Sequence, residues 1–173
     1  MLRGINVSGQ KKIKMDDLRA VYESLHFDDV RTYIQSGNVI FKCSFSNIIE
    51  LTNTIEKKLE AVFGFSVSVI IRTKDEIKKV LESNPFLKNG KHDITKLYVT
   101  LLSATPSPAD VDSIHQITFE PEKAIVGERE VYLFCPNGYG KSKITNSFLE
   151  KKLGVYATTR NWRTVNMLYE LLN

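Results

Sequence analysis

The spacing of apolar and polar positions along the first half of the chain switches between the periods of strands and helices. Alternation every two residues is typical of half-buried strands, whereas apolar residues three or four apart are typical of helices with one buried face. In chain order, this pattern predicts a strand over 2–7, a helix from 15, strands over 30–35 and 39–43, a helix over 46–64, a strand over 67–72 and a helix over 73–84. Gly37 suits the first central position of a type II′ turn between the two strands of the hairpin.

The same order of elements returns after a linker-like stretch that contains Asn89-Gly90. The second half is predicted to form a strand over 96–102, a helix that Ser107 caps, a hairpin of strands over 118–125 and 130–135, a helix over 140–153, a strand over 155–157 and a C-terminal helix. Split-βαβ units have this order. The predicted fold class is therefore α+β, with two split-βαβ (ferredoxin-like) halves, each an antiparallel sheet with helices packed on one face. The halves are expected at residues 1–86 and 95–173, joined by a linker at 87–94.

Composition is that of an ordinary globular protein, with 42% hydrophobic and 25% charged residues among 173. No apolar run approaches the ~20 residues of a transmembrane helix, and no secretory signal opens the chain. We therefore expect a cytoplasmic protein with no membrane partner. Cys43 and Cys135 each lie near the end of an apolar run and neither belongs to a CxxC pair, so both are expected to be buried. No metal site and no cofactor is predicted.

Charge adds a modest preference for anionic partners. The net charge is +4, and basic residues gather near both ends of the chain. The first group consists of Arg3, Lys11, Lys12, Lys14 and Arg19, and the second of Lys141, Lys143, Lys151, Lys152, Arg160 and Arg163. These groups favour nucleic acid or a phosphorylated small molecule as the partner. The three histidines, His26, His92 and His115, lie apart from one another and from any candidate nucleophile, so no catalytic constellation is identified.

A glycine-rich stretch from Cys135 to Ser142 comes close to a phosphate-binding loop, since a predicted strand precedes it and a predicted helix follows. Cys135 stands where that loop has its first glycine, however, and Pro136 lacks a backbone N–H. A weaker hypothesis is that Lys141, Ser142 and Lys143 hold one anion at a helix N-terminus. The alternative is that the stretch only begins the helix.

The segment before the C-terminal helix gathers polar groups beside an aromatic ring. Arg160 can grip a phosphate or a carboxylate with a pair of hydrogen bonds, and Trp162 offers a face on which a base can stack. Asn161 between them is a further candidate ligand-binding residue. The structural alternative is that Thr159 or Asn161 caps the helix. In that interpretation Trp162 anchors the helix in the core and Arg160 pairs with an acid.

Another polar group surrounds the predicted hairpin turn. In a split-βαβ sheet this turn lies beside the start of the first strand, so Arg3 is expected to reach residues 35–38, whereas Asn6 is expected at the opposite end of that strand. The candidate ligand-binding residues of this group are Arg3, Gln35, Ser36 and Asn38. The structural alternative is that these side chains satisfy the turn and the strand ends.

Three stretches of the sequence resemble one bacterial family. They are Leu-Arg-Gly-Ile-Asn-Val at 2–7, Arg-Thr-Tyr-Ile-Gln-Ser-Gly-Asn-Val-Ile-Phe at 31–41, and residues 143–153 together with Thr-Thr-Arg-Asn-Trp at 158–162. The chain is similar to the family called domain of unknown function 1697, essentially from end to end. The resemblance implies a cytoplasmic bacterial α+β protein without an established activity.

Three functions stay open on the sequence. The favoured one is a binding module for an anionic ligand, either nucleic acid or a phosphate-bearing metabolite. The second is a small-molecule enzyme with a polar site between the two halves, a common place for such sites. The third is a structural or interaction protein that assembles through exposed sheet edges. The oligomeric state is not predicted.

Overall fold

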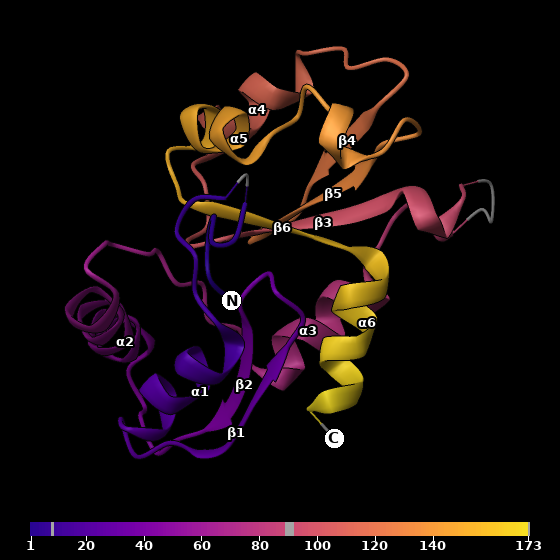
Figure 1. Ribbon diagram of the computed structural model, residues 1–173. Helices are drawn as coiled ribbons and strands as arrows, with labels where there is room; N and C mark the ends of the chain where they lie inside the picture. The colour runs from indigo at the N-terminus through magenta and orange to yellow at the C-terminus, as the bar shows by residue number, and fades with distance from the viewer. Residues whose placement is uncertain (8, 89–91, 173) are drawn as a thin grey trace. The chain divides into compact units, whose positions relative to one another are not determined.

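The computed structural model describes residues 1–7, 9–88 and 92–172. These residues form a mixed α+β fold with six α-helices and two antiparallel sheets, one of two strands and one of four (Figure 1). The chain divides into two compact units, residues 1–71 and 72–173. The Asn89-Gly90 pair of the predicted linker lies outside the described residues.

The first unit consists of one hairpin and two helices. Its elements are α1 (Met15–Glu23), β1 (Asp28–Tyr33), β2 (Asn38–Lys42) and α2 (Ile48–Phe63), and β1 pairs with β2 in antiparallel register. α1 packs against β1 and α2. It does so because Leu18 and Tyr22 share one face of α1, as their spacing predicts. This face meets the apolar stripe of α2, formed by Leu51, Ile55 and Leu59, in one core.

Residues 2–7 do not form the strand that their apolar positions indicated. Leu2 forms a single antiparallel bridge with Val69. The chain then turns, because Gly4 and Asn6 take left-handed backbone conformations, with φ of 66° and 55°. Left-handed residues cannot continue a β-ladder, whose residues need extended backbone. The predicted strand around Val69 is therefore reduced to the bridge with Leu2, and the rest of the predicted first strand to a bridge between Val7 and Gln10.

The hairpin turn is longer than the two-residue turn that Gly37 suggested. Tyr33 pairs with Asn38, so residues 34–37 form a four-residue loop. Ile34 has φ of 50° and Gly37 has φ of 73°. A left-handed conformation at a β-branched residue is a genuine outlier. The turn therefore carries backbone strain that its surroundings must hold.

The second unit is built on the four-stranded sheet. Its elements are α3 (Lys74–Glu82), β3 (Leu97–Leu102), α4 (Pro108–His115), β4 (Lys123–Val126), β5 (Glu130–Phe134), α5 (Asn146–Leu153), β6 (Ala157–Asn161) and α6 (Trp162–Leu171), with 3₁₀ turns at Ile94–Lys96 and Tyr139–Lys141. The strand order is β4-β5-β3-β6, and every neighbouring pair is antiparallel. The elements β3-α4-β4-β5-α5-β6 follow the strand–helix–strand–strand–helix–strand order that the sequence predicts.

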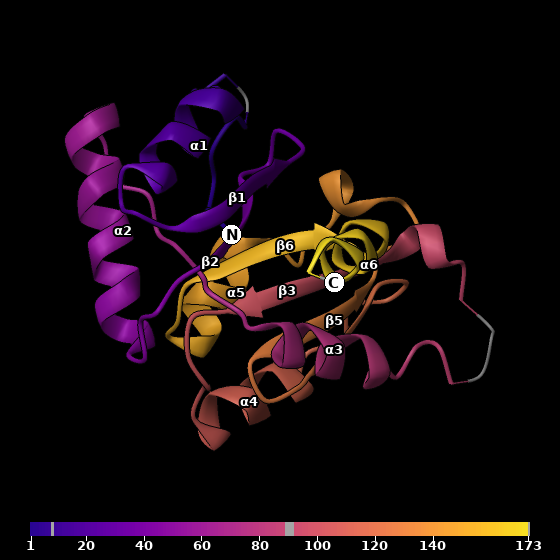
Figure 2. The same cartoon turned by 90° about the horizontal axis from the view of Figure 1, so that it is seen from below.

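Helices cover both faces of this sheet (Figure 1, Figure 2). α4 and α5 lie on one face, where Leu149 packs with Val131 and Leu133. α3 and α6 lie on the other face. There α6 contacts β3 and β6, and the Tyr132 hydroxyl of β5 donates to the carbonyl of Val80 in α3 at 3.1 Å. The prediction that helices pack on one face of the sheet therefore holds for α4 and α5. It does not account for α3 and α6, which cover the opposite face.

The division between the units falls before α3, whereas the sequence predicts this helix as part of the first half. α3 packs against α6, and Ile77 and Val80 on its inner face are buried. The helix begins with the predicted capping box, in which Thr73 and Glu76 each bind the other's backbone N–H. Local sequence thus determined the start of α3, while its packing partner lies far along the chain.

Two further expectations differ from the structure. α5 begins at Asn146 rather than near 140, because the Thr145 hydroxyl caps it and residues 139–141 form a separate 3₁₀ turn. Cys135 is buried as predicted, but Cys43 is exposed. Cys43 follows Lys42, the last residue of β2, so it lies where the chain has already left the hairpin.

Candidate functional site

The side chain of Asn6 ties two loops of the first unit together. Its Nδ2 donates to the carbonyls of Ile13 at 2.9 Å and Gln35 at 2.8 Å, and its Oδ1 accepts from the Ile13 N–H at 2.9 Å. Both amide donors are therefore occupied, so Asn6 positions the loops and does not bind a ligand itself. The expectation that Asn6 lies far from the hairpin turn is wrong. The left-handed backbone at Gly4 and Asn6 brings the chain back to that turn.

Gly37 allows the N-terminal segment to approach the hairpin turn closely. Its carbonyl accepts from the Leu2 N–H at 2.8 Å. A Cβ atom at position 37 would lie 2.7 Å from Ile5 Cδ1 and 2.9 Å from Leu2 Cβ. This crowding and the left-handed φ of 73° together require glycine here.

Three non-glycine residues of these loops, Asn6, Lys11 and Ile34, have left-handed backbone conformations. Such residues cost about 1–3 kcal/mol each and tend to occur at functional sites. Lys11 is held by two contacts: its Nζ donates to the carbonyl of Ser66 at 2.7 Å and lies 5.8 Å from the ring centroid of Phe65. Lys11 therefore stabilises the loop, because its ammonium group contacts a backbone carbonyl and an aromatic ring of the same unit.

A groove of about 600 Å³ opens beside these loops. Ile13, Met15 and Phe63 give it an apolar lining, and Lys12 and Lys14 also line it. Lys14 has extended backbone and the side chain of Ile13 is buried. Successive side chains of an extended segment point to opposite sides, so the two lysines lie on the same side of it.

The charges of this groove are only partly paired. No carboxylate in the described part of the chain forms an ion pair with Lys12 or Lys14. Asp16 and Asp17 also line the groove, and Asp16 faces Arg19 at 3.7 Å. Gln35 lines it as well and is exposed. The groove thus combines two ammonium groups, two carboxylates and two primary amides, of which the amide of Asn6 is bound to the loops.

The glycine-rich segment of the second unit has its backbone N–H groups already bound. The Lys141 N–H donates to the carbonyl of Gly138 at 3.1 Å, and the Ser142 N–H donates to another carbonyl of the same loop at 3.0 Å. The Lys143 N–H donates to a carboxylate oxygen of Glu122 at 3.2 Å. These N–H groups bind carbonyls of the loop and the carboxylate of Glu122, so they are not directed at a ligand. α5 begins only after them, at Asn146.

Burial determines the protonation of Cys135, the thiol near the Glu122 carboxylate. Glu122 is only 8% exposed. Burial raises the pKa of the Cys135 thiol to about 11, a hydrogen bond with Ser142 lowers it, and the charge of Glu122 raises it further. Cys135 is therefore a protonated core thiol and not a nucleophile.

The segment at the start of α6 is held by its own contacts. Asn161 caps the helix, because its Oδ1 accepts from the Thr164 N–H at 2.7 Å, and Trp162 is buried. Arg160 is also buried, and its Nη1 donates to the Thr158 hydroxyl at 2.8 Å. Burial lowers the pKa of Arg160 to about 10. The cap by Asn161 and the anchoring by Trp162 agree with the structural alternative for these two residues.

The predicted hairpin group is divided by the structure. Asn38 is fully buried, and its Nδ2 donates to the carbonyl of Tyr33 and to the Ser36 hydroxyl, both at 3.0 Å. The backbone N–H of Arg3 donates to the carbonyl of Ser68 at 2.9 Å. Ser36 and Asn38 therefore contribute to the turn itself, while Gln35 lines the groove.

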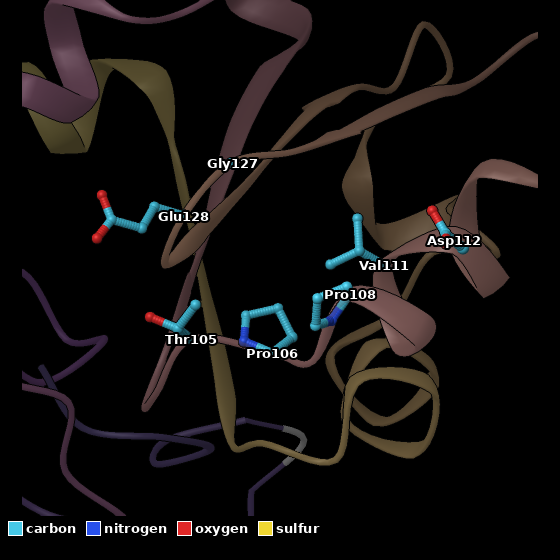
Figure 3. Close-up of a pocket in the computed structure, with 7 residues that line it drawn as sticks. All are labelled: Thr105, Pro106, Pro108, Val111, Asp112, Gly127 and Glu128. Atoms are coloured by element: carbon cyan, nitrogen blue, oxygen red, sulfur yellow. The ribbon is translucent and has the colours of Figure 1, made fainter.

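A smaller pocket of about 230 Å³ lies in the second unit beside the β4–β5 hairpin (Figure 3). Pro106, Pro108 and Val111 give it an apolar lining, and Glu128 of the hairpin borders it. The Glu128 carboxylate accepts a hydrogen bond from Lys79 Nζ at 2.7 Å, which neutralises it. The pocket therefore offers apolar contact beside a second carboxylate, that of Asp112.

The described residues contain neither a candidate metal centre nor a membrane span. No group of three or more His, Cys, Asp or Glu side chains among them is arranged to hold a metal ion. No helix in the described ranges combines the length and the apolar character that crossing a bilayer requires.

Sequence reasoning missed five polar residues of the groove, two of which are Asp16 and Asp17. Lys12 and Lys14 were noted for charge alone, and Asn6 was placed away from the hairpin. The alternation of Lys12, the apolar Ile13 and Lys14 is the pattern from which a shared side for the lysines could be inferred. No comparable pattern exists for Asn6, because its role depends on the fold of two separate loops.

Comparison with known proteins places this architecture in a family. The family described as Protein of unknown function (DUF1697) matches residues 1–132. No curated protein matches the chain. The solved structure of the conserved bacterial protein SP0830 from Streptococcus pneumoniae is similar over 100% of this chain and 96% of that chain, with a TM-score of 0.75 and 22% sequence identity. This likeness concerns the fold alone. Because the family match covers most of its length, the chain belongs to DUF1697, a family of proteins of unknown function.

Proposed function

We propose that the protein binds an anionic ligand, a phosphate-bearing metabolite, in the groove of the first unit. The observation that carries the proposal is the pair Lys12 and Lys14, which line the same groove and form no ion pair within the described residues. Each ammonium group has three donors and no acceptor. Hydrogen bonds from such groups to phosphate oxygens are charge-assisted and stronger than neutral ones.

The charge pattern of the groove favours a small ligand over a nucleic acid strand. Asp16 and Asp17 line the same groove as the lysines, and only Asp16 has a cation, Arg19, within 4 Å. A nucleic acid strand repeats its phosphates along its whole length. It would therefore bring negative charge beside these carboxylates, a repulsion of about 1 kcal/mol at 4 Å in water and more where water is displaced. A metabolite can instead place its only charged group at the lysines.

We also infer that both units are split-βαβ (ferredoxin-like) units. The strand order β4-β5-β3-β6, with antiparallel neighbours throughout, supports this for the second unit. In the first unit, the Leu2 N–H donates to the carbonyl of Gly37 at 2.8 Å, and Leu2 bridges to Val69 on its other side. This position between the hairpin and the segment around Val69 corresponds to that of β3, between β5 and β6, in the second unit.

Calorimetric titration of the full chain tests the proposed function. The probes are inorganic pyrophosphate, ribose 5-phosphate and a short single-stranded oligonucleotide. At least one phosphorylated small molecule is expected to bind to the wild type. The double variant Lys12→Ala/Lys14→Ala is expected to bind it about tenfold more weakly or worse, since hydrogen bonds to charged groups contribute about 1.5–3 kcal/mol each.

The matched control is Lys57→Ala/Lys58→Ala on α2, which removes the same charge from the same unit outside the groove. Its affinity is expected to stay close to that of the wild type. Equal weakening in both double variants would assign the effect to overall charge and contradict the proposal. A failure of every phosphorylated small molecule to bind would also contradict it. Tight, steeply salt-dependent binding of the oligonucleotide alone would indicate a nucleic-acid protein instead.

A further inference from the structure

Resting on the proposed function, we infer that the metabolite is a nucleoside phosphate. In this assignment Gln35 reads the edge of the base, and Asp17 accepts hydrogen bonds from the ribose hydroxyls. The phosphate lies at Lys12 and Lys14. The inference depends on the combination of groups in one groove, because a simple anion needs only the lysines.

Gln35 is suited to recognition because its backbone is fixed while its side chain is open. Its carbonyl accepts from Asn6 Nδ2 at 2.8 Å. Its side-chain amide makes no hydrogen bond within the described residues and lines the groove. A primary amide presents one acceptor and two donors side by side, which matches the paired donor and acceptor on the edge of a base.

The apolar lining suits the face of a base. Met15 and Phe63 line the groove together with Ile13. The ring of Phe63 is stacked with that of Phe65, with centroids 6.3 Å apart and an angle of 26° between the planes. This contact holds one side of Phe63 and fixes its orientation. Every base has a π-face that can stack on such a ring, whatever its sequence identity.

The two carboxylates of the groove differ in their surroundings. Asp16 faces Arg19 at 3.7 Å, whereas Asp17 has no ion-pair partner in the described part of the chain. An ionised carboxylate only accepts hydrogen bonds, and ribose hydroxyls are the donors that carboxylates bind in dinucleotide sites. Asp17 is therefore assigned to the sugar, and Asp16 serves as its natural control.

The size and stiffness of the groove agree with this ligand. Its volume of about 600 Å³ is that of a site for one small molecule. The loops beside it are fixed by the three hydrogen bonds of Asn6. A site that is ordered before binding loses less conformational entropy when the ligand arrives.

Titration of the full chain with the four nucleoside 5′-monophosphates and with ribose 5-phosphate tests the inference. At least one nucleotide is expected to bind about tenfold or more tightly than ribose 5-phosphate, because a bidentate base contact supplies that much discrimination. Gln35→Ala is expected to remove this advantage and to leave ribose 5-phosphate affinity unchanged. Gln116→Ala, at an exposed glutamine of the second unit, is the matched control and is expected to change neither affinity.

The role of Asp17 is tested with ribose and 2′-deoxyribose forms of the preferred nucleotide. Asp17→Asn is expected to reduce the preference for the ribose form, and Asp16→Asn is expected to retain it. If Asp17→Asn leaves that preference unchanged, the sugar assignment is overturned. Lysine-dependent phosphate binding without any advantage for nucleotides, or without an effect of Gln35→Ala, overturns the inference and leaves the proposed function intact. Absence of any lysine-dependent binding removes both.

Discussion

Two Lys-x-Lys segments, one in each unit, look alike in sequence and differ in how the fold holds them. Residues 12–14 precede α1, and residues 141–143 precede α5 by a short interval. The middle residue is buried in both, with Ile13 at 3% and Ser142 at 9% exposure. Gly140 directly precedes the second segment, whereas Lys11 precedes the first. The sequence made the second segment a candidate anion site at a helix N-terminus and assigned the lysines of the first only to a basic group.

The difference lies in the group that organises each loop. The Ile13 N–H donates to the neutral amide of Asn6 at 2.9 Å, whereas the Lys143 N–H donates to the carboxylate of Glu122 at 3.2 Å. An amide fixes a loop without changing its charge. A carboxylate fixes the loop and also supplies the negative charge that a ligand would bring. The loop of the first unit is therefore held without a carboxylate, and the two carboxylates that line its groove, Asp16 and Asp17, come from α1.

The largest effect is expected where the N-terminal segment packs against Gly37 of the hairpin turn, which supports the loop before α1. Gly37→Ala forces a Cβ to within 2.7 Å of Ile5 Cδ1 and 2.9 Å of Leu2 Cβ at a left-handed φ. Overpacking and the left-handed alanine together are expected to lower the free energy of unfolding by about 3–5 kcal/mol. Urea denaturation followed by circular dichroism measures this loss.

Gly64 provides the matched control for that substitution. It ends α2 with φ of 75°, and a Cβ there meets no atom within 4 Å. Gly64→Ala therefore adds backbone strain alone and is expected to cost about 1–2 kcal/mol. Equal losses at the two glycines would show that the contact with Leu2 and Ile5 does not hold the turn.

Removing the amide organiser has the next largest effect. Asn6→Gly keeps the left-handed backbone accessible and deletes the three side-chain hydrogen bonds. The free energy of unfolding is expected to fall by about 2–3 kcal/mol, since each bond contributes about 0.5–1.5 kcal/mol. Asn6→Ala is expected to lose more, because alanine also carries the left-handed strain. If Asn6→Gly lowered the free energy of unfolding by less than an exposed surface substitution does, the conclusion that Asn6 holds the two loops together would be contradicted.

Removing the carboxylate organiser has a smaller effect and no consequence for the groove. Glu122→Ala leaves the Lys143 N–H without its acceptor and is expected to cost about 1–2 kcal/mol. Glu122→Gln keeps an acceptor oxygen and is expected to recover most of that loss. Neither variant is expected to change the affinity of the groove for the probes named above. A change in that affinity would contradict the assignment of the ligand to the first unit.

The elements that the sequence predicted well are those defined by local chemistry. The apolar stripe of α2 and the left-handed Gly64 that ends it, and the capping box of Thr73 with Glu76, all lie where expected. The segment 2–7 was misjudged, because the left-handed backbone of Asn6 is stabilised by carbonyls of two distant loops. No local pattern records such contacts.

The candidate site shows the same limit. Gln35 was predicted as a ligand-binding residue and lines the groove, while the lysines beside it were read only as part of a basic group. The roles of Arg3 and Arg160 stay predictions. The alternating pattern indicates that Lys12 and Lys14 lie on one side of the chain. The carboxylates of Asp16 and Asp17 come from the first turn of α1, and only the folded unit brings all four side chains into one groove.

The smallest effect concerns the two thiols, of which Cys135 forms a hydrogen bond with Ser142 in the second segment. Cys43 is exposed and Cys135 is buried. Iodoacetamide is expected to alkylate Cys43 in the folded protein and Cys135 only after unfolding, because the buried thiol is protonated and inaccessible. Mass spectrometry of the labelled peptides distinguishes them, and Cys43→Ser supplies the control. Rapid labelling of Cys135 in the folded chain would show that its loop opens readily.

The pH dependence of the same thiol extends the test to Glu122. Burial raises the pKa of Cys135 to about 11, whereas an unfolded thiol titrates near about 8.5. The folded chain therefore holds the proton more tightly, so the stabilising contribution is complete below about 8.5 and is lost as pH rises through the folded value. The stability of the wild type relative to Cys135→Ala is expected to fall across this interval in urea denaturation. Because the charge of Glu122 also raises this pKa, the fall should still begin near about 8.5 but end at lower pH when both chains carry Glu122→Gln. An unchanged interval would mean that the carboxylate, although bound to the loop, does not act on the thiol.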